Sequence, residues 1–104
     1  MPRRSALYRT PNAWVSEGGA WPAGPFVADA PPPVRYAAFI AAALADALDG
    51  RARAEVAREA GLERSTLYDL LNGSTWADTI TLAKLEVVLD ASLWPGGPLT
   101  PEGQ

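Results

Sequence analysis

The chain of 104 residues contains no cysteine and no histidine. The first absence excludes disulfides, thiolate nucleophiles and cysteine metal sites, and the second removes the commonest general base and metal ligand. Acidic pairs such as Asp46 with Asp49 and Glu55 with Glu59 fall on predicted helices, where such pairs usually serve solvation and ion pairing. We therefore expect no catalytic residues, no metal and no cofactor.

A long hydrophobic run is also missing. The longest apolar stretch, AAFIAAALADAL, is rich in alanine and interrupted by Asp46, and it is shorter than the roughly 20 residues that a transmembrane helix needs. No apolar region follows the basic residues of MPRRSALYRT, as a signal peptide would require. We expect a cytoplasmic chain with no membrane partner.

Positive charge is scarce, since nine basic residues face twelve acidic ones and the net charge is −3. DNA-binding domains usually carry a basic footprint, so this balance argues mildly against a nucleic acid partner. The length allows one small domain with a correspondingly small core.

Proline and glycine divide the chain. Residues 1–33 hold seven of the ten prolines and end in ADAPPP, which is typical of an extended N-terminal arm. The arm also contains aromatic and β-branched residues, so we expect part of it to pack on the domain or to pair as a short hairpin. These residues are Tyr8, Trp14, Val15, Trp21, Phe26 and Val27. Residues 95–104, PGGPLTPEGQ, are expected to form a flexible tail.

Residues 34–94 carry apolar side chains at helical spacing. Proline is favoured at a helix start, and the first predicted helix runs from Pro33 to Gly50. A second helix is predicted over residues 52–60, a third over 64–71, and a fourth after a cap at Asp78 or Thr79. The apolar stripe of the fourth helix is predicted to comprise Ile80, Leu82, Leu85, Val88 and Leu89. A short final turn is predicted from Ser92, so the expected fold class is all-α, a compact bundle of four to five short helices.

The segment GLERSTLYDLLNG, residues 61–73, lies between two glycines that can each end a helix. Two helices that cross at about 90 to 120° need a turn residue free to take positive φ and a small residue at the crossing. Gly61 and Ala57 meet these needs. The inward apolar positions are Val56, Ala60, Leu62, Leu67 and Leu70. This pattern predicts a helix-turn-helix.

The stretch RAEVAREAGLERSTLYDLLNG, followed by DTITLAKLEVVLDASLW, resembles the helix-turn-helix of the Xre family, the lambda-repressor-like DNA-binding domains. The resemblance covers residues 39–94. It implies that the helix 64–71 lies in the major groove of double-stranded DNA with its first residues on base edges. The base-reading residues would be Arg64, Ser65, Tyr68 and Asp69, and the phosphate contacts Arg51, Arg53, Thr66, Asn72, Ser74 and Thr75.

The chain departs from the family pattern at three positions. Glu63 stands where the family usually has Ser or Thr, Arg53 where it has Gln, and Arg51 where it has an apolar residue. Residues 51–72 carry four arginines and four carboxylates, so this region gains little from counterion release. We expect the missing affinity to come from a homodimer, from the basic arm or from both, although the arm could also be merely a solvated start of the chain. The arm residues concerned are Arg3, Arg4 and Arg9.

The sequence thus predicts a small DNA-binding transcriptional regulator of the repressor type. Its dimer surface would use Leu93, Trp94, Trp76 or the aromatic arm, each of which could equally belong to the core. A protein-interaction module or antitoxin-like partner protein on the same fold is the alternative. At single residues a simpler role also stays open: Arg64 could pair with Asp69 or Tyr68, and Ser65 could serve the first turn of its helix.

Overall fold

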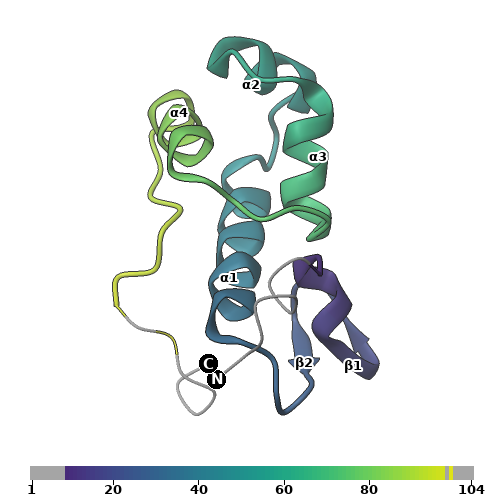
Figure 1. Cartoon of the computed structure of the whole chain (residues 1–104). Coiled ribbons are helices and arrows are strands. Elements are labelled where there is room, and N and C mark those ends of the chain that lie inside the picture. Colours follow the sequence, from purple (N-terminus) through teal and green to yellow (C-terminus); the bar gives the residue numbers. More distant parts are fainter. Residues whose placement is uncertain (1–8, 98, 100–104) are drawn as a thin grey trace.

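The computed structural model describes residues 9–97 and residue 99. The described chain is mostly helical, with four α-helices and a small antiparallel hairpin near the N-terminus (Figure 1). The elements are a 3-10 helix η2 (Pro11–Trp14), β1 (Val15–Ala20), β2 (Gly24–Phe26), α1 (Pro32–Ala47), α2 (Arg53–Ala60), α3 (Arg64–Asn72) and α4 (Thr79–Leu89). Arg3, Arg4 and Tyr8, as well as most of the predicted tail, lie outside the described residues.

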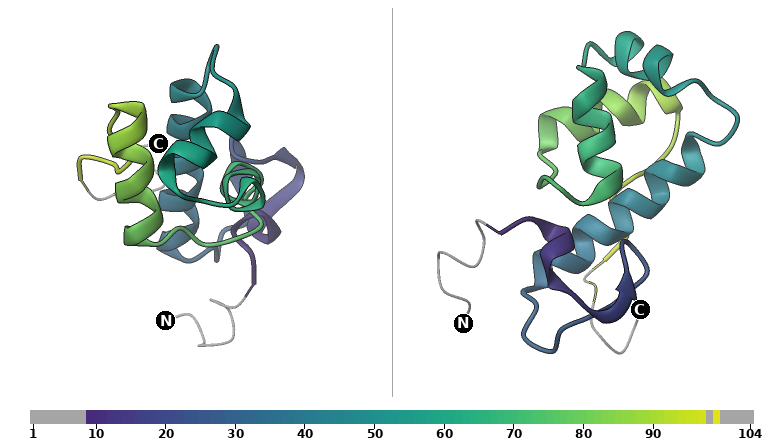
Figure 2. Two further views of the ribbon diagram at one scale, coloured as in Figure 1. Left: turned by 90° about the horizontal axis from the view of Figure 1, so that it is seen from above. Right: turned by 90° about the vertical axis from the view of Figure 1, so that its right-hand side faces the viewer.

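Helix α1 is the central element, with α3 and α4 on either side of it and α2 across one end (Figures 1 and 2). Pro32 and Pro33 open α1, where the missing N–H costs no helical hydrogen bond. Its inward face then follows the expected spacing, with Val34, Ile40 and Leu44 buried. The predicted start and course of this helix are confirmed.

Helices α2 and α3 both end in the same glycine motif. Gly61 has φ 71° and Gly73 has φ 73°, in the left-handed region that glycine enters without a steric penalty. The N–H of Leu62 then donates to the carbonyl of Ala57 at 2.8 Å, and that of Ser74 to the carbonyl of Asp69 at 3.0 Å. These bonds satisfy carbonyls that the helix ends would leave unpaired.

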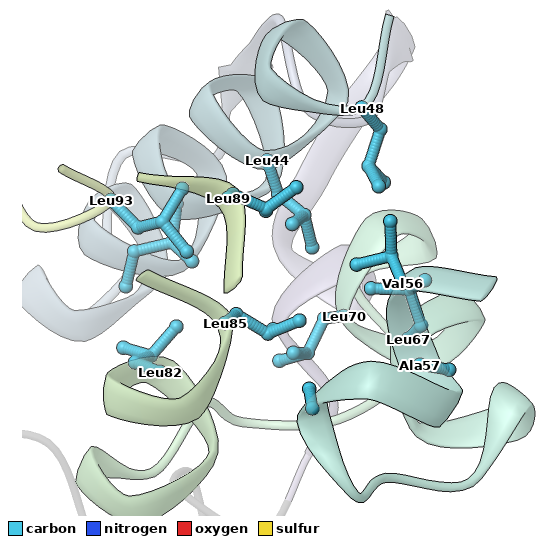
Figure 3. Packing of buried hydrophobic residues seen from close by; sticks show 12 residues of the cluster. Leu44, Leu48, Val56, Ala57, Leu67, Leu70, Leu82, Leu85, Leu89 and Leu93 are labelled. Carbon is cyan, nitrogen blue, oxygen red and sulfur yellow. The ribbon is translucent and has the colours of Figure 1, made fainter. Parts of the chain in front are cut away.

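The core lies where the four α-helices meet (Figure 3). Each helix contributes apolar side chains, and the segment after α4 adds one more. The buried cluster comprises Ile40, Leu44, Leu48, Val56, Ala57, Ala60, Leu67, Leu70, Leu82, Leu85, Leu89 and Leu93. The inward positions predicted around the turn at Gly61 are thus confirmed, with Leu62 packed at the edge of the cluster.

Two predictions, one about α4 and one about the segment that follows it, are wrong. Asp78 caps α4 as predicted, accepting from the backbone N–H of Thr81 at 2.8 Å. Ile80, however, is 70% exposed, because Leu82 faces the core and residues two apart on a helix lie on nearly opposite sides. The helical turn predicted from Ser92 is wrong as well. Asp90, with φ 50°, ends α4, and Leu93 enters the core from an irregular segment.

The N-terminal segment packs on α1 and also forms a short hairpin. Trp14 is buried and η2 lies against α1, while β1 pairs with β2 in the register Val15 with Phe26 and Ala20 with Gly24. The chain is therefore mostly helical rather than all-α. None of the helices within residues 9–97 combines the length and the apolar character needed to cross a membrane.

Candidate nucleic-acid interface

The outward face of α3 carries the four side chains that the sequence assigns to base reading. Arg64, Ser65, Tyr68 and Asp69 are all exposed, whereas Leu67 and Leu70 face the core. A helix of nine residues is marginal in isolation, so α3 depends on this packing to form. Glu63 precedes α3 without a side-chain capping bond, as its type suggests. Packing, rather than capping, therefore holds this polar face outward.

The first residue of α2 meets the same face. The guanidinium carbon of Arg53 lies 5.6 Å from the centre of the Tyr68 ring, within range of a cation–π contact. Tyr68 is nevertheless 39% exposed. The structure thus brings one predicted phosphate contact and one predicted base contact together.

At the other end of the face, Asp69 is already engaged. The hydroxyl of Ser74 donates to Asp69 Oδ1 at 3.1 Å, while the N–H of Ser74 bonds the Asp69 carbonyl. Within residues 9–97 no ion pair joins Arg64 to Asp69. Asp69 in the last part of α3 and Ser74 just beyond its end, which were predicted in different roles, are thus joined by hydrogen bonds.

Arg51 precedes α2 and is engaged away from this face. Its Nη2 is 3.7 Å from Glu59 Oε1, and its Nη1 donates to the carbonyl of Val88 in α4 at 3.5 Å. The structure therefore does not bring Arg51 to the side chains gathered around Tyr68. Of the other predicted phosphate contacts, Thr66 and Thr75 are partly buried.

Of the four arginines of residues 51–72, two make ion pairs within the described residues and two do not. Arg58 pairs with Glu55 and Arg51 with Glu59, all at exposed positions. Within the described residues, Arg53 and Arg64 make no ion pair. Of these four arginines, the two without an ion pair in the described chain are therefore those at the beginnings of α2 and α3.

The N-terminal segment reaches the far end of α3, which lies toward the hairpin in Figure 1. The backbone N–H of Asn12 donates to the carbonyl of Gly73 at 2.9 Å, and its Nδ2 to the carbonyl of Asn72 at 3.0 Å. The indole N–H of Trp21 donates to the carbonyl of Leu71 at 3.1 Å. The sequence carries no local signal for these bonds, because the partners lie 50 or more positions apart.

Arg9 is the one residue of the predicted basic arm that the structure describes. Its guanidinium stacks 4.3 Å from the centre of the Trp14 ring and donates to the Ala13 carbonyl at 3.1 Å. Its own carbonyl accepts from the indole N–H of Trp76, in the loop between α3 and α4, at 2.9 Å. Arg9 is therefore held near that loop and exposed.

The predicted dimer residues have different surroundings. Leu93 is fully buried, so it is not available for a second chain. Trp76 and Trp94 line an apolar groove of about 270 Å³ beside the start of α1, together with Pro32, Pro33 and Tyr36. Within the described residues, no group of three or more acidic side chains is placed to hold a metal ion.

Comparisons with protein-family models, with curated proteins and with solved structures found no match.

Proposed function

We propose that this protein is a small transcriptional regulator of the repressor type that binds double-stranded DNA through α2 and α3. The observation that carries the proposal is the outward polar face of α3, held by its buried leucines beside a glycine turn that joins it to α2. This is the arrangement in which a second helix enters the major groove and the first crosses the backbone. The resemblance of residues 39–94 to the Xre family supports the same function.

Each exposed side chain of α3 has a partner that its chemistry favours. The guanidinium of Arg64 fits the O6 and N7 acceptors of guanine, and Ser65 can donate or accept. Tyr68 can pack on a thymine methyl group or reach a phosphate. Asp69 Oδ1 is engaged by Ser74, which leaves Oδ2 to accept from the amino group of cytosine.

Phosphate contacts are assigned to the two ends of the same face. Arg53 is the strongest candidate, because it carries a charge without an ion pair in the described chain and already lies over Tyr68. Asn72 and Ser74 follow at the far end of α3. Arg51 would have to leave Glu59 and Val88 before it could reach a phosphate, so its share in binding is small.

A homodimer completes the proposal, because the balanced charge of residues 51–72 leaves one copy with little electrostatic affinity. The exposed side of α4 suits a second copy. Ile80 and Val87 stand two helical turns apart on it, 70% and 81% exposed, with the small Ala83 between them. In a two-fold arrangement each Ile80 would meet the Val87 of the other copy.

The decisive experiment is selection of bound duplexes from a random library by the full chain, followed by titration of affinity against salt. Arg64→Ala should lose about ten- to hundredfold in affinity and relax the preference at one base pair. Arg58→Ala is the matched control, since it removes the same charge from an exposed position that pairs with Glu55. Equal effects of the two variants would rule out base reading by Arg64.

A protein-interaction module is the second candidate, and the charge balance is the observation in its favour. The net charge of −3 and the carboxylates of Glu63, just before α3, and Asp69, within it, are less suited to DNA than to a protein partner. Failure to bind any duplex at low salt, together with a stoichiometric protein complex, would support this candidate. Affinity that falls steeply with salt would support DNA binding.

A further inference from the structure

The C-terminal end of α3 is closed by a segment from the other end of the chain. The last carbonyls of a helix have no partners within it and are usually satisfied by water or by a local turn. Here the carbonyls of Leu71, Asn72 and Gly73 accept three hydrogen bonds, all from Asn12 and Trp21. These three bonds are additional to those that the glycine turn itself supplies at this helix end.

Close packing accompanies these bonds. Gly73 is buried although it ends a helix, and a Cβ built on it would overlap the indole ring of Trp21. Trp21 is in turn held edge-to-face by Phe26 of β2, with the ring centres 6.0 Å apart. The hairpin therefore presses on the end of α3 through a side chain with little freedom to move.

The same segment is fixed to α1. Trp14, at the end of η2, is buried, and η2 packs against α1. Residues 11–26 thus bridge the central helix and the far end of α3, as the side view in Figure 2 makes visible. Without this bridge α3 would be fixed mainly by Leu67 and Leu70 on its inner face.

From this geometry we propose that η2 and the hairpin, residues 11–26, position α3 for DNA, with Trp21 and Asn12 as the positioning residues. The inference rests on the proposed function. By holding the last turn, the two residues set the tilt and rotation of a nine-residue helix, and with them the directions of Arg64, Ser65 and Tyr68. Donors at the C-terminal end also offset its partial negative charge, which would otherwise face nearby phosphates.

The test compares Trp21→Phe with Tyr36→Phe. The first removes the indole N–H that bonds Leu71 and retains an aromatic ring. The second also retains a ring, and it removes a hydroxyl on α1 that makes no hydrogen bond within the described residues. Affinity and base preference are measured on the duplex selected by the unchanged chain, well below each melting temperature. Hydrogen exchange of the Gly73 and Ser74 amides reports the end of α3 without DNA.

Trp21→Phe should speed amide hydrogen exchange at Gly73 and Ser74 and alter the base preference. It should also lower the affinity for DNA about fivefold, which corresponds to the loss of one ordinary hydrogen bond. Tyr36→Phe should change none of these. Asn12→Ala deletes the side-chain bond to the Asn72 carbonyl, together with the bond that Asn12 Oδ1 accepts from the Thr10 hydroxyl. It should act in the same direction as Trp21→Phe, and it replaces that variant in the test if Trp21→Phe does not fold.

Two results would overturn the inference while DNA binding stands. One is unchanged affinity and base preference in folded Trp21→Phe and Asn12→Ala. The other is an equal loss in Trp21→Phe and Tyr36→Phe, which would indicate general destabilisation. If the unchanged chain selects no duplex, the proposed function itself is wrong, and the hairpin then has no role in DNA binding.

Discussion

Two glycines with nearly the same backbone conformation have very different surroundings. Nothing lies within 4 Å of a Cβ built on Gly61, whereas one built on Gly73 meets Trp21. Gly61→Ala should therefore lower the free energy of unfolding by about 1 kcal/mol, the cost of a left-handed residue with a side chain. Gly73→Ala should lower it by about 3 kcal/mol, because overpacking against the indole is added. Urea unfolding of both variants measures the difference, and equal costs would contradict the packing of Trp21 on Gly73.

Asp78 links the stability of α4 to pH. Hydrogen bonds from the backbone N–H of Thr81, and then from its hydroxyl, hold the pKa of the Asp78 carboxyl below its ordinary value. A carboxyl with a lowered pKa in the folded state stabilises the fold above the unfolded-state pKa of about 4, and the contribution is lost as pH falls through the lower folded-state pKa.

Asp78→Ala should accordingly lower the melting temperature at pH 7, and the gap to the unchanged chain should narrow as the pH falls below about 4. Melting curves across this range measure the effect. Asp78→Ser, which retains a capping oxygen but does not titrate, is the control and should show a smaller gap at pH 7. A gap independent of pH would mean that the charge of Asp78 adds nothing to the cap.

At the scale of whole elements, the four helices follow from periodic apolar residues, proline starts and glycine ends, which are local properties of the sequence. The stripe of α4 is where this reasoning fails. Its residues are apolar on several sides, so spacing alone does not separate the inward Leu82 from the outward Ile80. Which of the two side chains is buried is decided only by the packing of α4 against α1 and α2.

Substitution can test which side of α4 is buried. Leu82→Ala should lower the free energy of unfolding by about 2 to 5 kcal/mol, because it opens a cavity between tightly packed side chains. Ile80→Ala should change it by less than about 0.5 kcal/mol, since most of the side chain is in water. Chemical denaturation of the two variants under the same conditions measures both free energies of unfolding. Comparable losses would place Ile80 in the core after all.

At the scale of the whole molecule, the candidate site was only partly predictable. The exposed residues of α3 are visible in the sequence because they alternate with buried leucines at helical spacing. The bond of Arg51 to Val88 and the closure of α3 by Asn12 and Trp21 are not visible in the sequence. These contacts join positions that are 37 to 61 residues apart. Such contacts depend on how the elements pack, about which local patterns say nothing.

The balance of charge bears on the assembly. One copy with neutral α2 and α3 should bind DNA weakly, so we propose that two copies act together and that they meet at the exposed side of α4. Val87→Glu would set a carboxylate against Ile80 of the second copy. It should weaken self-association by about tenfold or more, because an unpaired charge is costly to bury. The melting temperature of the single copy should hardly change, since Val87 is 81% exposed.

Sedimentation at several protein concentrations measures the association. Ala45→Glu is the matched control, because it adds the same charge at an exposed position of α1. DNA affinity should fall with Val87→Glu and hardly change with Ala45→Glu, since the loss arises from the second copy rather than from the contact of α3 with bases. If both variants associate like the unchanged chain, α4 is not the dimer surface, and the extra affinity must be sought in another part of the molecule, beginning with Arg9 beside the loop after α3.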